Sequence, residues 1–340
     1  MEFVEYQFEK KYLSEYTQLI QDIYFAYPMF VKARVSEVQK ALNKDNPFLK
    51  FGTWKNFLIK DKGKSVSHIS AIIDSRMPSG VGLVGYFDSK ESCSYAKEAF
   101  KLAGDFLSSK GIHFVRGPVD LTTWKSFRVS YPEGQPPFLL EPFTRGYYRK
   151  LFEDHGFKVV QKNISTTGTL NQMEVEKFEK SYNQLQKQGL NFCQVQTKDV
   201  PNILPQIWKI SNEIFRDSWS FVSVGFDEFI FNLSNSDNQP LSLDIACDGH
   251  NKVVAFSLSA RDSYAGERKR VVVKTLGALS DYQKLGIGRA LLYSVYSRAR
   301  EDGIEELIFS TMRLDNGLAR NLAGRTLDVY REYAVYELML

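Results

Sequence analysis

The second half of the chain alternates β-branched apolar runs with apolar stripes that repeat at helical spacing. The apolar runs predict strands at residues 191–196, 241–246, 252–260, 271–276 and 306–312. Helices are predicted at 201–214, after the capping residue Asp199, and at 288–300, where Asp302 and Gly303 end the stripe. An order of strand, helix and strand is typical of an α/β domain with a right-handed crossover.

The first half of the chain carries the same unit. Its pattern predicts a strand at 82–87, a helix at 95–108 and a strand at 112–115. Gly85 and Gly111 are 26 residues apart, and so are Gly277 and Gly303 in the second half. Because the elements also follow one another in the same order, we favour a diverged duplication over a chance match of glycines.

Two interruptions divide the chain. Residues 132–142 are rich in proline and cannot form a continuous helix or a central strand, so they are predicted to form a surface loop. Residues 172–188 are polar with an irregular apolar stripe and predict a connecting helix that ends at Gly189. We therefore predict a first domain at 1–170, a connecting helix at 171–190 and a second domain at 191–340.

The composition fits a globular protein and argues against several other classes. Of the 340 residues, 43% are hydrophobic and 25% are charged, which suffices to fill the cores of two domains. The net charge of +4 is too small to indicate a nucleic-acid partner, and no apolar run is long enough to span a membrane. Cys93, Cys193 and Cys247 lie far apart in the sequence, which predicts reduced thiols in a cytoplasmic protein. The four histidines have no metal-ligand spacing, so no metal site is expected.

The segment from Gln283 to Leu292 lies between a valine-rich strand and an amphipathic helix, and it has the features of an anion site. A turn that enters a helix presents unpaired amides and the positive end of the helix dipole. Gly286 and Gly288 allow close approach of the backbone, while Lys284 and Arg289 add positive charge. A dinucleotide fingerprint would need a glycine where Leu291 stands. The Gly-Lys-Ser at 63–65 lacks the earlier glycine of an NTPase phosphate loop.

The sequence Gln283-x-x-Gly286-x-Gly288 resembles the signature of the GNAT superfamily of acyl-CoA-dependent N-acyltransferases. The resemblance implies an α/β fold of two GNAT-like domains, each with a mixed, largely antiparallel sheet flanked by helices. It also implies acetyl-CoA or another acyl-CoA as co-substrate. The implied contacts to that molecule are Ala278, Leu279, Gln283, Lys284, Leu285, Gly286, Ile287, Gly288, Arg289, Ala290 and Asn316.

The same resemblance implies how the co-substrate is held. The loop amides would bind the pyrophosphate, and a bulge within residues 276–279 would free backbone groups for the pantetheine arm. The oxyanion donor would be an amide near Ala278 or Leu279, and the strand at 307–312 would splay away to open a slot. In the first half, Glu91 and Ser94 fall where the second half has its glycine loop. We therefore expect a degenerate first domain and one acyl-CoA per chain.

The catalytic groups are less clear from the sequence. The amine must lose a proton before it attacks, and the nearest carboxylates in the expected layout are Glu213, Asp217 and Asp244. Tyr330 is the candidate acid for the departing thiolate. The expected acceptor is a primary amine on a small molecule or peptide, chosen by residues 213–229 and the face of the first domain. Two alternatives stay open: a non-catalytic acyl-CoA sensor, and an aminoacyl-transferase of the tandem GNAT-like type.

Overall fold

The computed structural model describes residues 1–173, 175–233, 241–315 and 327–340. The elements of the first half are β1 (Glu2–Tyr6), α1 (Lys10–Ile23), α2 (Pro28–Ala41), β2 (Gly52–Asp61), β3 (Lys64–Asp74), β4 (Val81–Ser89), α3 (Cys93–Ser109), β5 (Phe114–Gly117), β6 (Val129–Tyr131), α4 (Tyr148–Asp154) and β7 (Lys158–Thr169). Those of the second half are α5 (Val175–Lys187), β8 (Asn191–Gln194), α6 (Val200–Ile214), α7 (Phe226–Leu233), β9 (Leu241–Cys247), β10 (Val253–Arg261), β11 (Arg270–Ala278), α8 (Ile287–Glu301), β12 (Glu306–Arg313) and β13 (Asp328–Met339).

The strands and helices predicted from the apolar pattern are confirmed, with ends that shift by at most three residues. The unit of strand, helix and strand appears as β4, α3 and β5 in the first half and as β11, α8 and β12 in the second. Residues 132–142 form a loop, as their prolines require, but the prediction that the whole loop lies on the surface is wrong, because Phe138, Leu139 and Glu141 are buried. No helix in the described ranges is long and apolar enough to cross a membrane.

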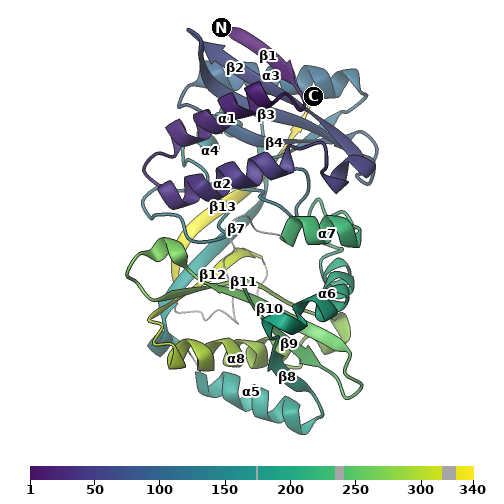
Figure 1. Ribbon diagram of the computed structural model, residues 1–340, viewed down its shortest axis with the longest axis vertical. Coiled ribbons are helices and arrows are strands. Elements are labelled where there is room, and N and C mark those ends of the chain that lie inside the picture. The colour runs from purple at the N-terminus through teal and green to yellow at the C-terminus, as the bar shows by residue number, and fades with distance from the viewer. Residues whose placement is uncertain (174, 234–240, 316–326) are drawn as a thin grey trace.

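The strands of both halves join into one sheet with the order β1-β2-β3-β4-β5-β13-β7-β12-β11-β10-β9-β8, and β6 pairs with β13. Within each half the pairing is antiparallel, except that β4 pairs with β5 and β11 with β12 in parallel. This is the mixed, largely antiparallel α/β arrangement that was predicted for each half. Figure 1 shows the two halves stacked along the long axis of the molecule, with β7 and β13 between them.

The last strand of each half lies on the sheet of the other half. Strand β7 ends the first half but pairs with β12, where Thr169 faces Glu306. Strand β13 ends the second half but pairs with β5, where Tyr336 faces Gly117, and with β7 over most of its length. The C-terminus therefore lies beside the first half (Figure 1). The domain limits at residues 170 and 191 stay a prediction, but the strand pairing crosses them.

Helices cover both faces of the sheet in each half. In the first half, one core packs α1 and α2 against β2–β4, and a second core packs α3 and α4 against the opposite face. In the second half, α8 lies on the sheet and α5 packs on α8. On the other face, α6 packs against β10 and β11, and the site described next lies between this face and the first half.

Candidate functional site

Strands β11 and β12 separate in the middle of the second half and open a slot. Their parallel pairing runs from Arg270 opposite Glu306 to Val273 opposite Phe309 and stops there. Strand β11 continues to Ala278 with β10 as its neighbour. The predicted splay of the strand at 307–312 is thus confirmed, and one side of β11 faces an open wedge.

The bulge on β11 lies earlier than was predicted. Leu258 of β10 faces Thr275, whereas its neighbour Ser259 faces Val273, so Lys274 is the extra residue. The expectation of a bulge within residues 276–279 is therefore wrong. Gly277 has a different role in packing, because a Cβ there would lie 3.2 Å from Cγ2 of Ile214 and would crowd α6 against β11.

The backbone of β11 directs two amides into the slot. The Leu279 N–H donates to the Val254 carbonyl at 3.0 Å, so the hydrogen-bonded pairs of this antiparallel ladder fall at 279, 277 and 275. Successive residues of a strand point their backbone groups to opposite sides, so Leu276 and Ala278 point away from β10. The Gln283 side-chain amide donates to the Ala278 carbonyl at 3.0 Å on that side. Of the two predicted oxyanion donors, Ala278 is therefore available, and Leu279 is already bonded.

The loop after β11 has the geometry of an anion cradle. Gly286 is the N-cap of α8 with a φ of 91°, and Lys284 also has a positive φ, of 68°. The Ala290 N–H donates to the Gly286 carbonyl at 3.1 Å, so the first helical hydrogen bond closes only there. The amides of Ile287, Gly288 and Arg289 precede it and have no acceptor within the helix. These amides and the helix dipole favour an anion at this point.

A cavity of about 1030 Å³ connects this loop with the space between the two halves. Its lining includes six of the predicted loop residues: Gln283, Lys284, Gly286, Ile287, Gly288 and Arg289. It also includes both walls of the slot and residues of α6 and α7. Leu285 is exposed and Ala290 is buried in the core, so the structure places neither side chain in the cavity. Asn316 lies outside the described residues.

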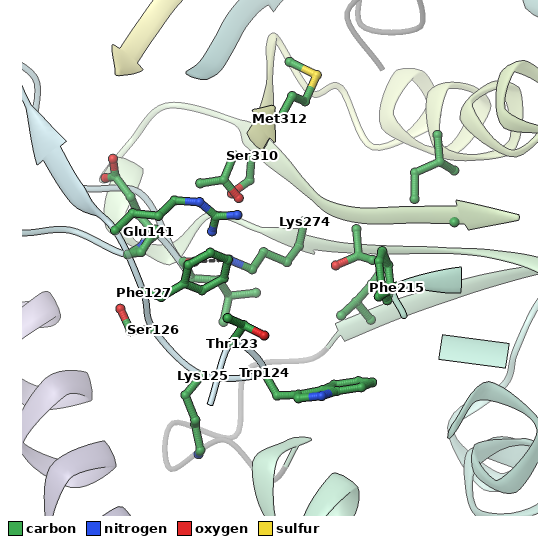
Figure 2. A pocket seen from close by; sticks show the side chains of 18 of the residues that line it. Thr123, Trp124, Lys125, Ser126, Phe127, Glu141, Phe215, Lys274, Ser310 and Met312 are labelled. Carbon is green, nitrogen blue, oxygen red and sulfur yellow. Dashed lines mark hydrogen bonds between the residues drawn. The ribbon is translucent and has the colours of Figure 1, made fainter. Parts of the chain in front are cut away.

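The first half contributes the opposite wall of the cavity. The connection between β5 and β6 reaches across to the second half, where Trp124 donates from Nε1 to the Val222 carbonyl at 2.9 Å. The Trp124 ring lies against Phe221 and Phe229. Figure 2 shows the segment from Thr123 to Phe127 facing Lys274 and Ser310 across the cavity. This wall could not be predicted from the sequence, because its residues have no periodic pattern and meet the slot only through the fold.

The corresponding slot in the first half is filled by the chain itself. Strands β4 and β5 pair only from Val81 to Leu83. Beyond that point the Val119 N–H donates to the Val84 carbonyl at 2.8 Å, and the Tyr86 N–H donates to the Asp120 carboxylate at 2.5 Å. A Cβ on Gly85 would come within 2.0 Å of the Val119 carbonyl oxygen. The backbone groups that are free on β11 are therefore occupied on β4.

The predicted catalytic side chains do not line the described part of the cavity. Tyr330 packs against Phe138 and donates its hydroxyl to the Pro136 carbonyl at 2.7 Å. Glu213 is exposed on α6, and Asp217 is exposed beside Arg216. Asp244 faces α8, where Arg298 holds both its oxygens at 2.6 Å. Its neighbour Leu243 lines the cavity, because alternate side chains of a strand point to opposite faces. None of these four side chains is among those that line the cavity, so their catalytic roles stay predictions.

Four other carboxylates line the cavity, all from the first half: Glu37, Asp88, Asp120 and Glu141. Burial raises the pKa of Asp120 to about 6 against the opposing field of Arg34, and it also raises the pKa of Asp88 and of Glu141. The side chains of Asp88, Asp120 and Glu141 are 2%, 6% and 0% exposed, whereas that of Glu37 is 29% exposed. Glu37 is thus the carboxylate of this set that a molecule in the cavity can reach most easily.

Comparison with known families agrees with the slot and the loop. Residues 204–328 match the model of the acetyltransferase (GNAT) family. The second half of the chain contains a GNAT domain. A comparison with curated protein sequences finds no match. Across the described ranges, no group of three or more His, Cys, Asp or Glu side chains is arranged to hold a metal ion.

Solved structures show that the likeness extends over the whole chain. A tandem GNAT protein from the clavulanic acid biosynthesis pathway has a TM-score of 0.63 at 10% identity, over 99% of this chain and 98% of that one. A GCN5-related N-acetyltransferase from Sphaerobacter thermophilus has a TM-score of 0.54 at 12% identity, over 99% and 95%. A probable N-acyltransferase from Enterococcus faecalis has a TM-score of 0.60 at 10% identity, over 100% and 73%. The chain therefore has a tandem GNAT fold.

Proposed function

We propose that this GNAT protein is an N-acyltransferase that moves an acetyl or other acyl group from acyl-CoA to a primary amine. The observation that carries the proposal is the continuity of three features. The cradle at residues 283–289 opens into the β11–β12 slot, and the slot opens into the cavity between the halves. Such a path can hold a pyrophosphate, an extended pantetheine arm and an acceptor in that order.

The described residues divide the binding tasks. The amides of Ile287, Gly288 and Arg289 receive the pyrophosphate, with Lys284 and Arg289 adding charge. The slot-facing backbone of Leu276 and Ala278 binds the extended arm and directs the thioester toward Lys274. The Ala278 N–H then donates to the thioester oxygen as that oxygen gains negative charge.

The transfer itself is a direct attack. The neutral amine attacks the thioester carbon and a C–N bond forms. The C–S bond breaks with its electron pair on sulfur, which takes the second proton that the nitrogen loses as it becomes an amide. The proton that the ammonium group must lose passes to Glu37, whose carboxylate stays accessible in the cavity beside Arg34. Ser310 lines the slot with a buried hydroxyl that has no hydrogen-bond partner in the described part of the chain, and it supplies a donor for the departing sulfur.

The test is turnover of acetyl-CoA with a panel of primary amines, measured by the release of the free CoA thiol. A matched pair of variants tests the cradle, Gly286→Asp and Gly63→Asp. Both glycines have a positive φ. Gly63 lies in the turn between β2 and β3, where a side chain would contact nothing. We expect turnover in the wild type and in Gly63→Asp, and none in Gly286→Asp. Saturable CoA binding without turnover of any amine would favour a sensor instead.

A further inference from the structure

Two basic side chains of the cavity lie at the point where the thioester and the acceptor would meet. Lys274 is the bulged residue of β11, and its ammonium group donates to the Leu140 carbonyl at 2.7 Å. Figure 2 shows its side chain extending toward Phe127 and the wall from the first half. Arg128 comes from that wall, and its guanidinium lies 3.6 Å from the centre of the Phe127 ring.

The backbone conformation and the burial of Arg128 are both energetically unfavourable. Its φ is 104°, a backbone conformation that a residue with a side chain rarely adopts. Its Nε is buried and has no hydrogen-bond partner in the described structure. A buried, unsatisfied donor on a strained residue points to a partner that binds from the cavity.

The nearby carboxylates already have cationic partners. Glu141 accepts from Arg331 at 2.6 Å and from the Tyr333 hydroxyl at 2.5 Å. Glu37 lies 3.2 Å from Arg34. Within the described residues, neither Arg128 nor Lys274 forms an ion pair with a carboxylate. Both cations therefore line the cavity without a carboxylate of the described ranges in direct contact.

The electrostatics agree with this geometry. Burial and the charge of Arg128 lower the pKa of Lys274 to about 8, against the weaker opposing fields of Glu141 and Glu37. Burial also lowers the pKa of Arg128 to about 9. Each cation is thus destabilised by its surroundings, and an anion that contacted both would relieve the repulsion and satisfy the free donors.

We propose that Arg128 and Lys274 form a subsite for a carboxylate carried by one of the two substrates of the proposed acyl transfer. The inference rests on the proposed function only for the identity of those substrates. The carboxylate belongs either to the acceptor, as in an amino acid, or to the acyl group, as in a dicarboxylic acyl-CoA. In the first case, the amine of the same acceptor lies toward Glu37.

A binding experiment tests the subsite without catalysis. Calorimetry measures succinate binding to the CoA-saturated protein, with succinamide as the uncharged control probe. We expect succinate to bind and succinamide to bind at least tenfold more weakly. Arg128→Gln and Lys274→Met should each weaken succinate at least tenfold, whereas Lys150→Met on the exposed surface of α4 should change nothing. If succinate and succinamide bind alike, or both cavity variants keep the wild-type affinity, the proposal is overturned.

Steady-state rates identify the source of the carboxylate. One arm compares α-amino acids with their α-amides at fixed acetyl-CoA, and the other compares succinyl-CoA with acetyl-CoA at a fixed uncharged amine. We expect the wild type to prefer the carboxylate in one arm by at least tenfold in kcat/KM, and both variants to lose that preference. If the enzyme turns over amines with no carboxylate preference in either arm, the subsite is wrong and the acyltransferase stands. If nothing is turned over but succinate binds as expected, the acyltransferase fails and the carboxylate site stands.

Discussion

Replacing Gly286 by aspartate tests the anion cradle at residues 283–289 most directly. Gly286 has a φ of 91° and caps α8, so any side chain there strains the backbone by about 1 kcal/mol. The new Cβ would lie 3.3 Å from the Ser181 hydroxyl, which an exposed side chain can accommodate. We therefore expect a folded protein with a modest loss of stability.

The effect on CoA binding should be much larger. A carboxylate about 5 Å from one pyrophosphate charge is repelled by roughly 3 kcal/mol at the effective dielectric of a protein surface. It also occupies the place where the first helical amides would meet the anion. Together these effects predict at least about a hundredfold loss in affinity, which corresponds to about 2.7 kcal/mol.

Calorimetric titration with CoA measures the loss, and thermal unfolding confirms that each variant is folded. Gly286→Ala separates backbone strain from charge and should lose much less affinity than Gly286→Asp. Gly63→Asp carries the same strain at a φ of 76°, away from the cavity, and should bind like the wild type. A folded Gly286→Asp protein with unchanged CoA affinity would refute the assignment of the cradle.

Four further predictions concern the rest of the chain. Titration with CoA should give one site per chain, because the Val119 backbone fills the slot on β4. Glu37→Gln should lower kcat at least roughly tenfold with CoA affinity within about twofold, because the amine loses its proton acceptor. His68 is buried with a pKa lowered to about 3, chiefly by burial, so it stabilises the fold above its unfolded pKa of about 6.5. That stability, up to about 5 kcal/mol, is lost as pH falls from 6.5 to 3, and His68→Gln should flatten this part of the unfolding curve. Removing residues 328–340 should disrupt the first half as well as the second, because β13 pairs with β5, β6 and β7.

Each of these predictions has a contrary outcome. Two equivalent CoA sites would mean that the slot on β4 opens. For Glu37, the control is Glu153→Gln in a comparable helix ion pair on the surface, and equal rates in both variants would remove Glu37 from the reaction. An unchanged slope of stability against pH in His68→Gln would assign the acid response to other groups. Native circular dichroism and unchanged proteolysis of a chain ending at residue 327 would show that the exchanged strand is dispensable.

The local features of this chain were predictable because they depend on neighbours in the sequence. Apolar runs and stripes specified the strands and helices, since a strand must bury alternate side chains and a helix one side. The order of β11, loop and α8 specified the anion cradle, because a glycine turn before a helix exposes amides wherever it occurs. The signature at Gln283, Gly286 and Gly288 therefore identified the co-substrate class from a few residues.

The side chains that line the cavity could not be chosen from local sequence in this way. Glu213, Asp244 and Tyr330 were chosen by their position along the chain, but whether a side chain reaches the cavity depends on register and on the partner strand. Asp244 points to α8, whereas Leu243 points to the cavity, and a shift of one residue would have reversed them. The bulge at Lys274 was also misplaced, because a bulge is a mismatch between two strands and neither strand shows it alone.

The sequence by itself determined the secondary structure, the tandem arrangement and the glycine loop that enters α8. The tertiary structure alone decided that β7 and β13 exchange places and that the first half closes its own slot with Val119 and Asp120. It also decided that Arg128 and Lys274 line the same cavity. The spacing of apolar residues over three to seven positions indicates which side of a single helix or strand is buried. Contacts between elements more than a hundred residues apart depend on the packing of the whole sheet, so the acceptor side of the site becomes visible only once the chain is folded.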